Sequence, residues 1–362
     1  MAYELDFIGV NEETKDADAI GIRWQESDES YTIGVYDGGI KVYGEKLKEH
    51  IDTYYLSDSE EKVIDFVICS HSDQDHTSGI KEILNNYTVN ALYMNRPWLY
   101  VKDIFDKVND GRITEESLKK RLREQYSYIS ELEDIAIEKN IPIFEAFQGS
   151  IINNRLTVLS PTKDFYLGLL IESDKTPLLE ETSSFTSFIK RSFQEILNAL
   201  IESWSEEKLK ENVTTSAENE MSAVILGQMD EENFLLTGDA GLRALNNAIE
   251  YAESILISLK DDVNFYQIPH HGGRHNISPS LLNNLIGEIV SEGSTNGKIA
   301  FVSAAKNSDH PLQMVVNAFT RRGVKVYKTD GGIINHHNNM PLREGWSGID
   351  KLNFNSSVEE WD

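Results

Sequence analysis

The chain contains 362 residues and carries a formal net charge of −26, with 60 acidic residues against 34 basic ones. Its length and its 40% hydrophobic content suffice for a sizeable core in one large or two ordinary domains. Because nucleic-acid-binding proteins normally carry a basic surface, this charge argues against unassisted binding to phosphate backbones. Bound divalent cations, or the short basic clusters 119–123 and 321–325, would have to offset it, although such clusters usually lie on a solvated surface.

The apolar stretches and the cysteine count exclude two further classes. The apolar stretches are far shorter than the about 20 residues that a membrane-spanning helix requires. Residues 1–10 lack the basic start and apolar centre of a signal peptide. The single cysteine, Cys69, permits no intrachain disulfide and no cluster of thiolate metal ligands. We therefore expect a cytoplasmic protein with no membrane role.

The N-terminal half predicts short strands followed by helices. Three strands, at 3–10, 19–25 and 31–36, are punctuated by Gly and Asp and predict a β-meander. An almost continuous apolar run at 63–69 predicts a strand buried on both faces. The elements expected next are a helix at 78–85, a strand at 89–94 and a long charged helix at 115–139.

Strands and helices alternate in the second half. After strands at 141–147 and 156–159, residues 163–216 predict an insertion with helical patterning at 185–204. Insertions of this length in compact domains often form lids over a cleft. The elements expected after it are strands at 222–229 and 233–237, a helix at 241–259, a strand at 263–268, a helix at 278–290, a strand at 298–302, and a helix and a strand that reach residue 326.

This order of elements predicts an α/β fold in which two mixed sheets pack face to face and helices cover the outside. The simplest such architecture is a four-layer αβ/βα sandwich. We expect residues 1–350 to form a single domain, with 163–216 as a helical insertion within it and 351–362 as a polar C-terminal tail.

A group of potential metal ligands follows the buried strand at 63–69. Residues 71–76 read His-Ser-Asp-Gln-Asp-His and so place four such side chains within one short loop. Imidazole and carboxylate together suit divalent ions, and two neighbouring ions require both terminal and bridging carboxylates. The alternative is an exposed polar turn in which Asp73 or Asp75 caps the following helix.

Two other predicted strands end in the same way. Asp239 follows the strand at 233–237, and His270 and His271 follow the strand at 263–268. Taken alone, Asp239 is equally well a helix N-cap, and the histidine pair a polar turn closed by glycines. Together, the three strand ends are expected to converge on one edge of the sandwich, which favours a metal centre.

The order of these motifs resembles the metallo-β-lactamase superfamily, and their details resemble most the nuclease-type domain of the ComEC/Rec2 competence proteins. The superfamily's His-x-His-x-Asp-His motif is His-x-Asp-x-Asp-His here, and an Asp at the second ligand position, Asp73, is typical of the ComEC-like group. The departures are Ala17 before Asp18, Gly273 after the His-His-Gly triplet, and the lack of any His between residues 149 and 161. The matching segments, in chain order, are 7–10 with 18–20, 36–39, 71–76 with 78–79, 219–222, 235–239, 269–272, 306–307 with 310–311, and 329–331.

The resemblance implies two metal positions, one better furnished than the other. The ligands of the better position would be Asp75, His76, Asp239 and His271. Those of the weaker position would be His71, Asp73 and a shared Asp239. An Asp in place of an imidazole makes the weaker position harder and more anionic, which favours Mn²⁺ or Mg²⁺ over Zn²⁺ there. We therefore expect one or two divalent ions, with Mn²⁺ favoured and Zn²⁺ or Mg²⁺ as alternatives.

Such a centre predicts phosphodiester hydrolysis, because a bound divalent ion lowers the pKa of water to about 7 and neutralises charge on a phosphoryl oxygen. Asp75 would orient the attacking water, and His270 or His310 would protonate the leaving oxygen. Lys306 and Asn307 would hold a phosphate oxygen. The alternatives are a turn residue before a proline for His310 and a solvated side chain for Lys306.

Three functions share this chemistry. The one that we favour is a ComEC-like DNA nuclease, acting in a prokaryotic defence or DNA-processing system under the control of a protein partner. A small-molecule phosphodiesterase would fit the acidic composition better. The third is a metal-binding signalling module with weak catalysis, which the incomplete ligand set and the insertion at 163–216 would suit.

Overall fold

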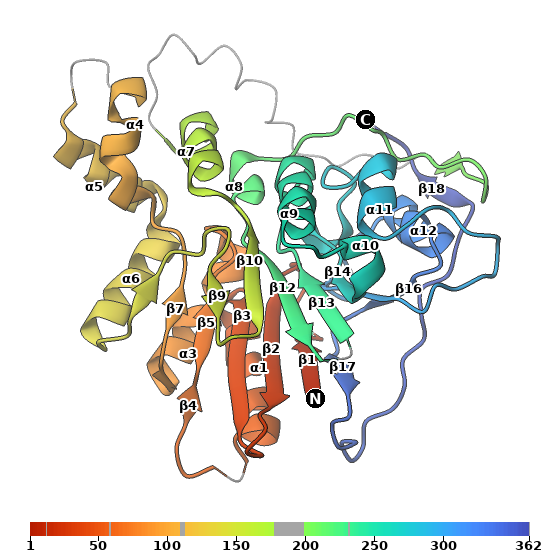
Figure 1. The fold of residues 1–362 in the computed structure, drawn as a ribbon, viewed down its shortest axis with the longest axis horizontal. Coiled ribbons are helices and arrows are strands. Elements are labelled where there is room, and N and C mark those ends of the chain that lie inside the picture. The colour runs from red at the N-terminus through yellow and green to blue at the C-terminus, as the bar shows by residue number, and fades with distance from the viewer. Residues whose placement is uncertain (12, 58, 109–112, 177–198, 231, 362) are drawn as a thin grey trace.

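The computed structural model describes residues 1–11, 13–57, 59–108, 113–176, 199–230 and 232–361. Within these residues, two seven-stranded mixed sheets form the centre of the molecule and helices pack around them (Figure 1). None of the helices in this part of the chain is both long and apolar enough to cross a bilayer.

The first sheet has an antiparallel half and a parallel half. Its strands are β1 (Tyr3–Phe7), β2 (Ala19–Gln25), β3 (Tyr31–Gly38), β5 (Phe66–Ile68), β7 (Leu92–Tyr93), β8 (Ile143–Phe144) and β17 (Ile334–Asn338). The antiparallel half runs β17-β1-β2-β3, and the parallel half continues as β3-β5-β7-β8. The expected N-terminal meander is thereby confirmed.

The second sheet repeats this division. Its strands are β9 (Ile151–Ile152), β10 (Leu156–Ser160), β12 (Val224–Met229), β13 (Glu232–Leu236), β14 (Val263–Gln267), β15 (Ile299–Val302) and β16 (Lys325–Lys328). The antiparallel half runs β9-β10-β12-β13, and the parallel half continues as β13-β14-β15-β16. In parallel halves, the carboxyl ends of neighbouring strands lie at the same edge, where α/β proteins place their sites.

Helices cover the outer face of each sheet. Those that bury side chains in the cluster outside the first sheet are α1 (Lys41–His50), α3 (Ile80–Asn86), α4 (Val101–Val108), α5 (Glu115–Gln125), α6 (Ser127–Glu138) and α7 (Lys163–Glu172). Those outside the second sheet are α9 (Leu242–Ser254), α10 (Leu259–Asp262), α11 (Pro279–Leu285) and α12 (Gln313–Arg321). Two further single-turn helices, α2 (Gln74–Thr77) and α8 (Ala217–Glu220), lie in the loops.

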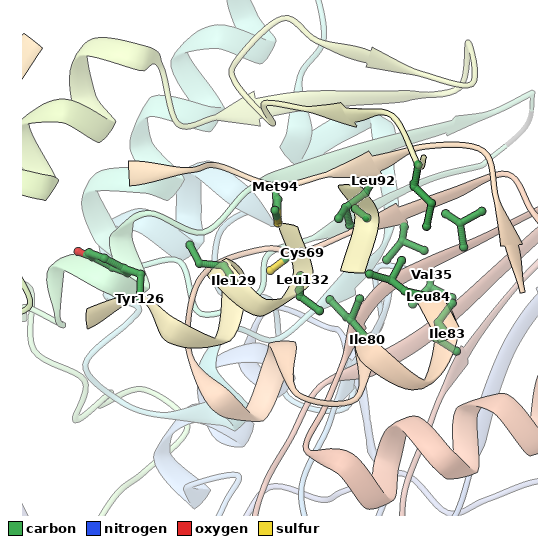
Figure 2. Close-up of a cluster of buried hydrophobic side chains, with 14 of the residues drawn as sticks. Val35, Cys69, Ile80, Ile83, Leu84, Leu92, Met94, Tyr126, Ile129 and Leu132 are labelled. Carbon is green, nitrogen blue, oxygen red and sulfur yellow. The ribbon is translucent and has the colours of Figure 1, made fainter. Parts of the chain in front are cut away.

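Alternate residues of the strands point to opposite faces, and both faces are buried. In the first sheet, Val35 and Val67 face the helices, whereas Tyr36 and Phe66 face the second sheet. Figure 2 shows the helix-facing cluster, in which Val35 and Leu92 lie near apolar side chains of α3 and α6. The second sheet is divided in the same way. Two facing sheets between two helical layers confirm the predicted α/β class and four-layer αβ/βα sandwich.

The strand expected at 63–69 is interrupted at Asp65. The Asp65 carboxylate accepts a hydrogen bond from the backbone N–H of Ile33 in β3, at 2.9 Å. The residues before it form β4 (Val63–Ile64), which pairs with β6 (Thr88–Val89) outside the main sheet. A single continuous strand was therefore a wrong prediction, because the one polar residue in the run binds the neighbouring strand.

Further elements differ from those predicted. The helix expected at 241–259 ends at Ser254, before the separate helix α10. The helix expected at 115–139 is divided into α5 and α6, because Tyr126 leaves helical geometry between them. The helix expected at 185–204 falls largely outside the described residues, and its part at β11 (Ala199–Ile201) is a strand. That strand pairs with β18 (Ser357–Glu359), so the expected polar tail also contains a strand. The division into one domain, an insertion and a tail stays a prediction.

A glycine faces a phenylalanine across one strand pair in each sheet. Gly34 of β3 lies beside Phe66 of β5, and Gly227 of β12 lies opposite Phe234 of β13. A Cβ atom on Gly34 would lie 1.9 Å from the Phe66 ring. A Cβ atom on Gly227 would lie 2.1 Å from the Phe234 ring. Both rings are fully buried between the sheets, so the glycines provide the space that they fill.

We expect Gly227→Ala to lower the free energy of unfolding by about 1–3 kcal/mol, because the added methyl collides with a buried ring. Phe234→Ala is expected to lower it by about 3–5 kcal/mol through the cavity that it leaves. Urea unfolding followed by circular dichroism measures both. The control is Gly348→Ala, where an added Cβ meets nothing within 4 Å. Equal stability of the Gly227 and Gly348 variants would contradict the tight fit.

Candidate metal centre

Three strand ends and one strand start bring four side chains together. Asp18 directly precedes β2, His76 lies in α2 after β5, Asp239 follows β13, and His271 lies in a short turn after β14. All four side chains are buried, and one ligand atom from each lies within 4.8 Å of the others. We call these four residues the Asp/His cluster. The strand ends therefore converge, as expected from the sequence.

Several polar atoms here are buried and, among the described residues, have no hydrogen-bond partner. They are both carboxylate oxygens of Asp18 and Nε2 of His71, whereas the equally buried Oδ1 of Asp239 and Nε2 of His76 face each other at 3.1 Å. Because an unpaired buried polar atom is costly, such atoms are normally satisfied by protein, water or an ion. Carboxylate and imidazole donors in combination suit a divalent cation. The residues present thus fit a bound metal ion.

Burial and neighbouring charges set the protonation of the Asp/His cluster. Burial raises the pKa of Asp18, although the adjacent imidazoles counteract it. Burial alone would also raise the pKa of Asp239, but His270 and His76 hold it well below its usual range. Burial would lower the pKa of His76, but Asp239 and Asp37 raise it. Asp239 is therefore ionised at neutral pH and available as a ligand.

Outer hydrogen bonds orient two of the imidazole rings. Nδ1 of His76 pairs with Oδ2 of Asp37 at 2.8 Å, which leaves Nε2 facing Oδ1 of Asp239 at 3.1 Å. Nδ1 of His71 lies 3.0 Å from Oγ of Ser70, and its Nε2 lies 3.7 Å from Oδ2 of Asp239. Contacts of this kind fix the tautomer and the direction of metal-binding histidines.

Asp18 is the member of the Asp/His cluster that sequence reasoning missed as a ligand. It belongs to the segment 18–20, which carries part of the resemblance, but it begins a strand rather than ending one. A search for acidic residues at both ends of core strands could have found it. Asp75, expected among the ligands of the better position, lies beside the cluster, with Oδ2 3.4 Å from Nε2 of His271.

The remaining predicted ligands lie next to the Asp/His cluster. His71 approaches Asp239, and Oδ2 of Asp73 lies 3.8 Å from Nε2 of His71. The other oxygen of Asp73 lies 2.6 Å from Nζ of Lys175. Nδ1 of His270 lies 2.9 Å from Oδ2 of Asp239. His71 and His270 thus both face Asp239 from outside the cluster, and Asp73 is paired with a cation.

A cavity of about 600 Å³ lies next to the Asp/His cluster. Its lining includes Asp75, His271, Asn307 and His310, all of which are candidate site residues from the sequence. Nδ1 of His310 lies 2.9 Å from Oδ2 of Asp16, which also lines the cavity. His310 therefore has a carboxylate partner on one side of its ring, in a space large enough for a small phosphodiester.

Three basic residues considered from the sequence do not contribute to this lining. Lys306 is exposed and donates a hydrogen bond to a nearby asparagine. Arg321 and Arg322 are buried and form ion pairs with Glu202 and Glu207. These two arginines are therefore neither a phosphate-binding patch nor a solvated surface, and they stabilise the fold around α12.

Comparison with known proteins leaves the family open. No family model matches the chain, and no curated protein sequence matches it. Among solved structures, the long form of RNase Z from yeast aligns with 92% of this chain and 41% of its own, at 10% identity and a TM-score of 0.38. The chain thus spans less than half the length of that protein, and nothing about its activity follows from so distant a likeness.

We expect Asp18→Asn to weaken the binding of a divalent ion on the order of 100-fold, because it removes one of the two carboxylates of the Asp/His cluster. Isothermal titration with Mn²⁺ and with Zn²⁺ measures the affinity. An ion at 100 times its Kd stabilises the fold by about 2.7 kcal/mol, so the variant should also lose the metal-induced rise in Tm.

Asp28→Asn is the matched control for that experiment, because Asp28 lies in an exposed turn and bonds only to Ser30 among the described residues. It should bind the ion as the unchanged protein does. If folded Asp18→Asn protein retained full affinity, the Asp/His cluster would not be the metal site.

Proposed function

We propose that the chain is a metal-dependent phosphodiester hydrolase of the metallo-β-lactamase superfamily, and that it acts as a ComEC-like DNA nuclease. The observation that carries this proposal is the buried Asp/His cluster, whose member His271 also lines the neighbouring cavity. The assignment to the superfamily and the choice of a phosphodiester as substrate rest on the order of the sequence motifs. Action in the cytoplasm and control by a protein partner are further parts of this proposal.

In this proposal the first ion is held by Asp18, His76, Asp239 and His271. When bound, a divalent ion supplies a Lewis acid for a phosphoryl oxygen and a nucleophilic water near neutral pH. Because two of the four ligands are carboxylates, Mn²⁺ suits the site, with Zn²⁺ and Mg²⁺ as alternatives. His71 and Asp73 adjoin this site and would contribute to any second position.

Side chains of the chain itself would orient the attacking water and protonate the leaving oxygen. Asp75 lines the cavity beside His271 and is placed to orient a water molecule. His310 is the better candidate for the proton donor, because Asp16 holds its Nδ1 while the side chain faces the cavity. His270 contacts Asp239 instead. A protonated imidazole can act as the general acid for a leaving oxygen.

A small-molecule phosphodiester is the second candidate substrate. The net charge of −26 and the acidic lining of the cavity, which contains Asp16, Asp75 and Asp309, favour it over a polyanion. The binding energy for a nucleic acid would then depend on the metal and on few basic side chains. The two substrates require the same metal chemistry, so a substrate panel separates them.

We expect His310→Gln to lower kcat on the order of 100-fold, because the variant keeps a similar polar volume but removes the proton donor. Asp75→Asn is expected to abolish cleavage. The assay uses single-stranded DNA, double-stranded DNA and bis(p-nitrophenyl) phosphate, each with and without Mn²⁺. His337→Gln is the control, because His337 is exposed on β17, and it should leave kcat unchanged.

Activity on bis(p-nitrophenyl) phosphate without DNA cleavage would contradict the proposed nuclease and support the small-molecule phosphodiesterase. No activity on any substrate, with the ion bound, would contradict the hydrolase and support the metal-binding signalling module. An unaltered kcat in the His310 variant would exclude His310 as the proton donor while leaving the metal chemistry in place.

A further inference from the structure

Lys175 reaches the metal centre from the chain segment that follows α7. Its Nζ lies 2.6 Å from Oδ1 of Asp73 and 3.5 Å from Oγ of Ser72. The second oxygen of Asp73 lies 3.8 Å from Nε2 of His71. An ammonium group therefore neutralises Asp73 beside His71, at the position where the resemblance would place a second metal ion.

Buried residues of the core fix this lysine in place. The backbone N–H of Lys175 donates to Oγ of Ser173 at 3.0 Å, and that hydroxyl pairs with the hydroxyl of Tyr126 at 2.9 Å. Both Ser173 and Tyr126 are almost fully buried. The ammonium also lies 5.5 Å from the centre of the Tyr126 ring, within the range of a cation–π contact. Lys175 is thus positioned by the fold.

Independently of this lysine, the second metal position has few ligands. His71 and Asp73 provide one donor each, Asp239 is shared with the Asp/His cluster, and residues 149–161 contain no histidine. A cation next to Asp73 removes its negative charge from the ligand set and repels a second divalent ion. The partly exposed Asp73 carboxylate therefore already has a positive partner.

We propose that the ammonium of Lys175 takes the place of the second metal ion, so that this chain binds one divalent ion, at Asp18, His76, Asp239 and His271. This inference rests on the proposed metal centre. Lys175 neutralises the charge of Asp73 and thereby limits the number of bound divalent ions to one. The chain would therefore use one divalent ion and one built-in monovalent cation in a fold that resembles two-metal hydrolases.

The test is the number of Mn²⁺ ions per chain, measured by elemental analysis after equilibration with the free ion and by electron paramagnetic resonance. We expect one ion in the unchanged protein and two in Lys175→Ala, with spin coupling between them in the variant only. His71→Ala, added to Lys175→Ala, should return the number to one, because it removes a ligand of the second position.

Lys163→Ala is the matched control. Lys163 stands on the preceding helix α7 and has similar contacts, an ion pair with Asp103 at 3.0 Å and a position 4.9 Å from the Tyr100 ring, but at neither metal position. It should bind one ion. Two ions in the unchanged protein, or one in folded Lys175→Ala, would overturn the role of Lys175 while leaving the hydrolase intact. Binding of no ion by any of these proteins would overturn the metal centre itself and this inference with it.

Discussion

The geometry of the candidate site depends on the hydrogen bonds of one carboxylate, that of Asp37. It stands at the end of β3 and accepts hydrogen bonds from the backbone N–H and the hydroxyl of Ser70, at 2.7 and 2.6 Å. It also pairs with Nδ1 of His76, at 2.8 Å. The carbonyl of Ser70 in turn accepts from the N–H of Ala223, at 2.9 Å, next to β12 of the second sheet. One buried carboxylate thus sets both the path of the ligand loop and the direction of a ligand ring.

Much of the fold was predictable because strands that are buried on both faces appear in the sequence as nearly continuous apolar runs. Val35 and Tyr36 illustrate it, since neighbours in sequence enter different clusters and both positions must be apolar. The prediction failed where a polar residue binds a distant partner. Asp65 binds the backbone of Ile33, and β11 pairs with β18 near the C-terminus. A local sequence pattern contains no information about either contact.

The candidate site was predictable as far as its residues follow the strands. His76, Asp239 and His271 each come after a core strand, and the structure brings these three together. Asp18 was missed because it precedes a strand, where an acidic residue has many ordinary roles. Lys175 was missed for a different reason. It is 102 residues from Asp73 in sequence, and an ion pair over that distance leaves no trace in spacing or composition.

The four residues of the Asp/His cluster belong to opposite halves of the sandwich. Asp18 and His76 are carried by the first sheet and its loops, whereas Asp239 and His271 follow strands of the second. An ion held by all four would act as a cross-link between the two sheets, in addition to the apolar side chains that pack between them. Its binding energy would then be part of the cohesion of the molecule. The free energy of unfolding would then depend on the concentration of the free ion.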